Sequence, residues 1–199
     1  MSKLPPAGVA GKLPPAGVAG NLPPAGVAGK IPIAGLVTGA TVFAIDQAAK
    51  YVVTGPLGIA QLGDVREIVS IFALRFVPNI GVSLGLLPAG GEAMRWALVA
   101  LTAAIAIGVL VWMVREKNRP DQIALGFVLG GAFGNILDRV RFGYVVDFAD
   151  LHFGEWRPFL VFNVADAAIT IGVLVLLARA LLVRDKSRAD RASVENLNA

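Results

Sequence analysis

The chain has no cysteine among its 199 residues and only one histidine, His152. Without cysteine it can form no disulfide, thiolate metal site or cysteine nucleophile, and it cannot itself be a lipid-modified bacterial lipoprotein. A single histidine argues against a histidine-rich zinc site. Charged residues are also scarce, at 16% against roughly 25% in soluble domains. Together with a hydrophobic content of 56% and a mean hydropathy of +0.70, this scarcity indicates an integral membrane protein.

Proline and glycine dominate the start of the chain. A nine-residue unit, Lys3 to Gly11, recurs at 12–20 and again at 21–29. Paired prolines block helices, and glycines favour loose turns. We therefore predict that residues 1–32 form a disordered leader, with a binding role as the alternative. Its prolines interrupt any continuous apolar core, which argues against a signal peptide.

Four apolar stretches follow, at 33–53, 94–114, 123–137 and 161–183. A membrane-spanning helix needs roughly 20 apolar residues, so the third stretch is short and needs neighbouring helices to cover it. The β-branched and aromatic segment 68–77 predicts strands. The predicted fold class is an all-α integral membrane protein, with four transmembrane helices in one domain over 33–183 and a small extracytoplasmic β-sheet.

Lysine and arginine gather in the leader, in the loop at 115–119 and in the charged tail 184–199. Such residues favour the cytoplasmic side of a membrane. Both termini are therefore predicted to be cytoplasmic, with 54–93 and 138–160 on the outer side. The same distribution explains the net charge of +4 without a nucleic-acid partner.

Ionisable residues at membrane depth are costly and therefore indicate function. Asp147 lies in the outer segment 138–160, and Asp166 lies near the start of the last apolar stretch. If these carboxylates converge, they could share one proton and activate water. Other polar residues fall at the same predicted depth, and they are Asp46, Lys50, Asn79, Asn135, Arg139 and Asn163.

Several of these residues also have a purely structural interpretation. Asp46 and Lys50 are four residues apart and could neutralise each other. Asp166 could be a carboxylate that the helix dipole favours at an N-terminus. Asp138 could form a local pair with the adjacent Arg139, and a site role for it is an equal alternative.

Glycine recurs every fourth residue at Gly126, Gly130 and Gly134, and helix packing alone can explain this small-residue ridge. For the whole chain, the alternatives to an enzyme are a proton-coupled membrane transporter and a non-enzymatic assembly protein. A transporter would thread acidic groups across the membrane, whereas these residues cluster towards one face. The clustering therefore favours an enzyme site.

Five motifs follow one another in a fixed order over 33–183. They are Asp46-Gln47-x-x-Lys50, Asn79-x-Gly81, Gly130-Gly131-x-x-Gly134-Asn135-x-x-Asp138-Arg139, Val146-Asp147-Phe148 and Phe162-Asn163-x-Ala165-Asp166. In order and spacing they resemble the motifs of the lipoprotein signal peptidase family, also called signal peptidase II. Two features depart from that pattern: the leader, and Leu84 where the family often has an aromatic residue.

The resemblance implies a four-helix aspartyl protease of the bacterial cytoplasmic membrane, with its active site near the outer face under a β-cradle. It implies Asp147 and Asp166 as the catalytic pair and assigns the six other polar residues to the lining or support of the site. The implied substrate is a diacylglyceryl-modified prolipoprotein, cut on the N-terminal side of its lipidated cysteine. Membrane lipid is an expected partner, a monomer is expected, and no metal or other cofactor is required.

Overall fold

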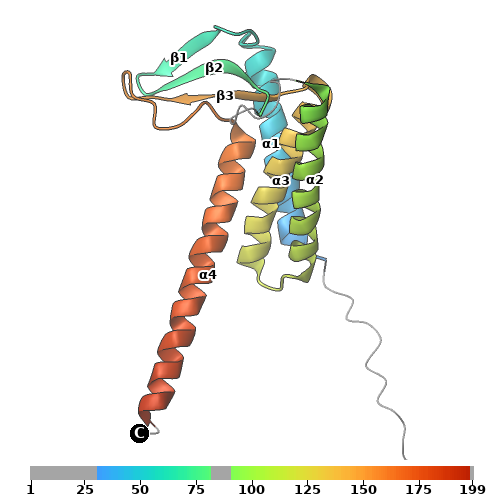
Figure 1. The fold of residues 1–199 in the computed structure, drawn as a ribbon. Helices are drawn as coiled ribbons and strands as arrows, with labels where there is room; N and C mark the ends of the chain where they lie inside the picture. Colours follow the sequence, from blue (N-terminus) through green and yellow to red (C-terminus); the bar gives the residue numbers. More distant parts are fainter. Residues whose placement is uncertain (1–30, 82–90, 198–199) are drawn as a thin grey trace, which may run out of the picture.

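The computed structural model describes residues 31–81 and 91–197, with side chains up to residue 182. Most of the predicted leader, and Leu84, lie outside the described residues. Four helices and three strands form a helical bundle with a small sheet across one end (Figure 1). The elements are α1 (Ile33–Thr54), β1 (Val65–Val69), β2 (Phe72–Asn79), α2 (Glu92–Arg115), α3 (Arg119–Phe142), β3 (Val145–Leu151) and α4 (Val164–Leu197).

Three of the described helices are long and apolar enough to cross a membrane. They are α2, α3 and the first part of α4, Val164–Leu182. The 22-residue α1 is not among them, because Asp46 and Lys50 interrupt its apolar sequence. The prediction of spanning helices is thus confirmed for three, and a fourth span stays a prediction. The helix α4 continues through the charged tail to Leu197.

The helix that contains the third apolar stretch is longer than the short helix that the stretch predicts: α3 has 24 residues and extends beyond 123–137 at both ends. Its first turn contains Pro120 and Asp121, which suit a helix N-terminus. It ends at Phe142, and the next residue, Gly143, has a φ of +87° that suits a glycine after the last turn. Within its apolar window, 61% of the residues are buried, against 11% in α2 and 17% in α4. Because α3 is the central helix, its neighbours cover the polar residues that follow the apolar run, and the helix continues through them.

Close helix contacts explain the glycine ridge. A Cβ on Gly126 or Gly130 would collide with the carbonyl oxygen of Gly35 or Gly39 on α1. The small-residue packing interpretation is therefore confirmed for Gly126 and Gly130, because these glycines let α1 and α3 pack at backbone distance.

Replacing Gly130 with valine is expected to push α1 away from α3 and lower the stability of the fold by about 1–3 kcal/mol or more. Thermal unfolding in detergent would show this as a lower Tm. Gly108→Val is the matched control, since an added Cβ on this exposed glycine of α2 meets nothing within 4 Å. Equal Tm values for the two variants would contradict the packing account.

The sheet is antiparallel, in the order β1-β2-β3. The predicted strand character of 68–77 is confirmed, although the segment contains a hairpin rather than one strand. Apolar residues of β2 and β3 pack against the last turn of α1, in a cluster that includes Val53, Leu74, Phe76, Val146 and Phe148. This cluster fixes the sheet against the end of the bundle, where the polar residues gather.

Candidate active site

Asp147 lies on β3 with its side chain 2% exposed. β3 pairs with β2 so that Asp147 faces Val77, just after a register shift in β2. Such irregularities often re-aim side chains next to active sites. Both carboxylate oxygens accept hydrogen bonds, from Asn79 Nδ2 at 3.0 Å and from Asn163 Nδ2 at 2.7 Å. The carboxylate of Asp147 is therefore buried, and two asparagine amides fix its orientation.

Asp166 lies in the first turn of α4, three residues after Asn163. The two form a reciprocal cap: the Asp166 N–H donates to Asn163 Oδ1 at 2.9 Å, and the Asn163 N–H donates to Asp166 Oδ2 at 3.2 Å. Asn135 Nδ2 from α3 donates to the other oxygen, Asp166 Oδ1, at 2.8 Å. Asp166 is thus a helix-capping carboxylate, as the structural interpretation expected, but it is also half-buried and tied to a neighbouring helix.

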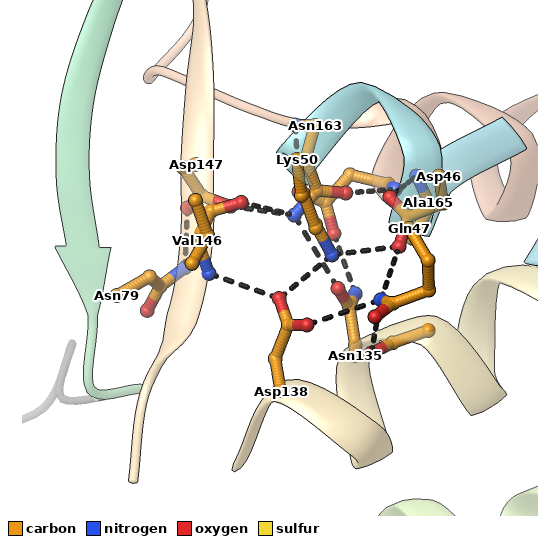
Figure 2. A network of polar contacts seen from close by, with 12 residues as sticks. Asp46, Gln47, Lys50, Asn79, Asn135, Asp138, Val146, Asp147, Asn163 and Ala165 are labelled. Atoms are coloured by element: carbon orange, nitrogen blue, oxygen red, sulfur yellow. Dashed lines mark hydrogen bonds and ion pairs between the residues drawn. The ribbon is translucent and has the colours of Figure 1, made fainter. Parts of the chain in front are cut away.

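Asn163 joins the two aspartates. Its side-chain amide donates to Asp147 while its side-chain oxygen accepts from the backbone of Asp166. The same amide lies 3.3 Å from Asn135 Oδ1, and Asn163 is itself only 1% exposed. Asn163 therefore contacts the Asp147 carboxylate through its side chain (Figure 2) and the Asp166 carboxylate through its backbone N–H.

Burial raises the pKa of Asp147 to about 7, and the negative charge of Asp166 adds to this effect. Hydrogen bonds from Asn79 and Asn163, and the positive charge of Lys50, oppose the increase. Near neutral pH, Asp147 therefore readily holds a proton beside a second carboxylate. A proton shared in this way supplies both an acid and a base.

Arg139 is close enough to interact electrostatically with Asp147, Asp166 and Asp138. Its Nε is buried and has no hydrogen-bond partner in the part of the chain that the structure describes. Arg95 of α2 donates to the carbonyl oxygen of Arg139 at 2.7 Å and so anchors this end of α3. Arg139 thus offers an N–H donor near the aspartates.

The predicted pair between Asp46 and Lys50 is present, with Nζ 2.8 Å from Asp46 Oδ2. Lys50 also lies 2.8 Å from Asp138 Oδ2. Asp138 therefore forms its ion pair with Lys50 of α1 and not with the adjacent Arg139. Gln47 donates to both Asp46 and Asp138 at 3.1 Å.

All eight residues singled out in the sequence lie at the end of the bundle next to the sheet. Asp138, for which the sequence leaves a local pair and a site role equally open, lies among them. Gln47 is not singled out by the sequence, although it lies inside a quoted motif. No cluster of three or more histidine, aspartate or glutamate side chains suited to a metal ion occurs within 31–81 and 91–182. The arrangement provides a carboxyl pair, three amides that orient it and a nearby guanidinium, which is a set suited to acid–base hydrolysis.

Known proteins share this sequence pattern. Residues 38–182 match the family model described as signal peptidase (SPase) II. A lipoprotein signal peptidase from Rhizorhabdus wittichii is 54% identical over 160 residues, covering 80% of this chain and 90% of that protein. A lipoprotein signal peptidase from Sphingopyxis alaskensis is 53% identical over 152 residues, covering 76% of this chain and 87% of that protein.

Known structures share the fold. Two solved structures, both described as bacterial membrane enzymes, resemble this chain with TM-scores of 0.65 and 0.62. Their sequences are 28% and 27% identical to it, and the similarity covers 74% and 77% of this chain and 92% and 90% of theirs. The family match extends over most of the chain, including the site residues from Asp46 to Asp166. The chain belongs to the signal peptidase II family.

Proposed function

We propose that this protein is an aspartic endopeptidase that removes the signal peptide from diacylglyceryl-modified prolipoproteins. The cut falls on the N-terminal side of the lipidated cysteine. The observation that carries the catalytic assignment is the linkage of Asp147 and Asp166 through Asn163, with the pKa of Asp147 at about 7. Family membership supports the substrate class.

In the proposed mechanism, a water molecule between Asp147 and Asp166 attacks the scissile carbonyl. The ionised carboxylate takes a proton from the water, and the protonated one gives its proton to the leaving amine of the cysteine residue. Either aspartate can begin as the base, because such a pair titrates as a unit. The positive charge of the Arg139 guanidinium, which interacts with both aspartates, is proposed to stabilise the negative oxygen that develops on the carbonyl.

We further propose that the end of the bundle with the sheet faces the outer side of the bacterial cytoplasmic membrane. The loop between α2 and α3 lies at the opposite end (Figure 1). It contains Lys117 and is flanked by Arg115 and Arg119, which favours the cytoplasmic side. In this orientation four spans, α1 included, leave both termini cytoplasmic. The polar site residues gather at one end and form no track across the bundle, which disfavours the transporter alternative.

The proposed function is tested by incubating the purified protein with a lipidated precursor and determining the masses of both products. A product that begins with the lipidated cysteine is the expected result. Cleavage only at other bonds would contradict the proposed specificity, and an uncut precursor would contradict the activity.

The activity is expected to fall as pH rises through about 7, because the dyad then loses the shared proton. Asn79→Ala removes a hydrogen bond that lowers the pKa of Asp147, so that pKa should rise and the alkaline limb of kcat should move to higher pH. Asn79 is exposed, so this variant should fold. A pH profile that is unchanged in Asn79→Ala, or an activity limb far above neutral pH, would contradict the assignment of Asp147.

A further inference from the structure

Two buried carboxylates outside the dyad hold the backbone next to it. Asp46 Oδ1 accepts a hydrogen bond at 2.9 Å from the N–H of Ala165, the residue immediately before Asp166. Asp138 Oδ2 accepts one at 3.1 Å from the N–H of Val146, the residue immediately before Asp147. Each catalytic aspartate therefore follows a peptide group that a separate carboxylate holds in place.

Lys50 connects these two carboxylates. Its Nζ lies 2.8 Å from Asp46 Oδ2 and 2.8 Å from Asp138 Oδ2, and Gln47 Nε2 bridges the same pair at 3.1 Å to each (Figure 2). Asp46 is 0% exposed, Asp138 is 1% exposed and Lys50 is 5% exposed. A continuous chain of polar contacts thus runs from the peptide before Asp166, through α1, to the peptide before Asp147.

Stability alone does not explain this cluster. Removing charges from water costs several kcal/mol for each ion, and well-packed apolar side chains often serve stability as well or better. The cluster also places two carboxylates and only one ammonium beside a carboxyl dyad, which adds electrostatic cost. Its contacts instead reach the two peptide groups whose positions determine how the dyad is spaced.

We propose that Asp46, Gln47, Lys50 and Asp138 form a buried brace that fixes the separation and orientation of the two catalytic aspartates. The proposal rests on the proposed function, since it takes Asp147 and Asp166 as the dyad. In it, Asp138 and Gln47 are positioning residues that act through the backbone of β3 and do not touch the substrate. The brace joins the strand that carries one aspartate to the helix that carries the other through α1 and α3, in addition to the direct contact that Asn163 makes with Asp147.

Asp138→Asn is the main test. Asparagine keeps the volume and an oxygen for the Val146 N–H, and it leaves Lys50 paired with Asp46, so the variant should fold. It weakens the ion pair between Lys50 of α1 and position 138 of α3, the residue that holds the Val146 N–H of β3. Because a displacement of about 1 Å can cost roughly 10²-fold in rate, we expect kcat to fall by about 10- to 100-fold. The KM for a lipidated precursor should change by no more than about twofold, since no contact with the substrate is lost.

Asp150→Asn is the matched control. Asp150 lies on β3, the strand that carries Asp147, and like Asp138 of α3 it is 1% exposed. It pairs with Arg75 at 3.0 Å and Arg157 at 3.3 Å, away from the brace. Its replacement should lower stability while leaving kcat near the wild-type value. If Asp138→Asn does not fold, Gln47→Met tests the proposal instead, because it removes the bridging amide from a half-buried position. The kcat of Gln47→Met should fall several-fold while its KM stays unchanged.

The outcomes separate the brace from the function that it serves. A folded Asp138→Asn or Gln47→Met variant with wild-type kcat would overturn the brace, provided that Asp147→Asn is inactive. An equal fall of kcat in Asp138→Asn and Asp150→Asn would also overturn it, since the loss of any buried carboxylate near the sheet would then have the same effect. Full activity in Asp147→Asn would instead refute the proposed dyad itself.

Discussion

Asp147→Asn is expected to lower the rate of precursor cleavage by on the order of 10³-fold or more while the protein remains folded. The amide cannot exchange a proton with Asp166, so the acid–base pair is lost. Folding should survive because Asn79 is exposed and can rotate to pair with the new amide. Asp147 also holds a proton readily at neutral pH, so a neutral replacement removes little charge from the folded site.

Asp166→Asn is expected to be equally inactive, because either carboxylate alone lacks its partner. The rate should be measured on a lipidated precursor in detergent or lipid, together with the unfolding temperature of each variant. Asp150→Asn again serves as the control for the loss of a buried carboxylate. If either dyad variant kept near-normal turnover, that aspartate would have no catalytic role.

The second large effect concerns the substrate. A precursor with an unmodified cysteine should be cut at least roughly 10²-fold less efficiently than the same precursor carrying the diacylglyceryl group. The dyad is proposed to lie at the outer membrane boundary, where acyl chains can stay in the bilayer while the peptide reaches Asp147 and Asp166. Lipid anchoring would then orient the scissile bond and contribute to the rate.

Both precursors must be inserted in the same membrane. The ratio of their kcat/KM values then reports how the enzyme recognises the lipid group, and not how much precursor reaches the membrane. A scrambled signal sequence with the lipid retained provides a further control for peptide recognition. Comparable kcat/KM values for the lipidated and unmodified precursors would show that the enzyme does not recognise the diacylglyceryl group. The chain would then act as a more general membrane protease.

Much of the candidate site could be predicted because its residues lie on helices, where spacing determines the shared face. Asn163 immediately precedes α4 and Asp166 lies three residues later in its first turn, and their reciprocal hydrogen bonds follow from that spacing. Asp46 and Lys50 are four residues apart on α1 and do form an ion pair. Local periodicity was sufficient for these contacts.

Contacts between distant segments could not be predicted in this way. The strand β3 pairs with β2, which is far from it in the sequence. Asp147 and Asp150 interrupt the apolar pattern by which a buried strand could be predicted from the sequence of β3. The length of α3 was underestimated for a related reason. Asp138 ends the apolar run in the sequence, but its charge is paired with Lys50 of another helix, so the helix continues past it.

The proton shared by Asp147 and Asp166 is the central claim, and infrared difference spectroscopy of the folded enzyme tests it most directly. Isotope labelling of aspartate identifies the carbonyl band of a protonated side chain. We expect one such band in the wild-type enzyme, lost as pH rises through about 7 and absent in Asp147→Asn. If the active enzyme shows no protonated aspartate that titrates near neutral pH, or if the band persists in Asp147→Asn, the dyad assigned here is contradicted.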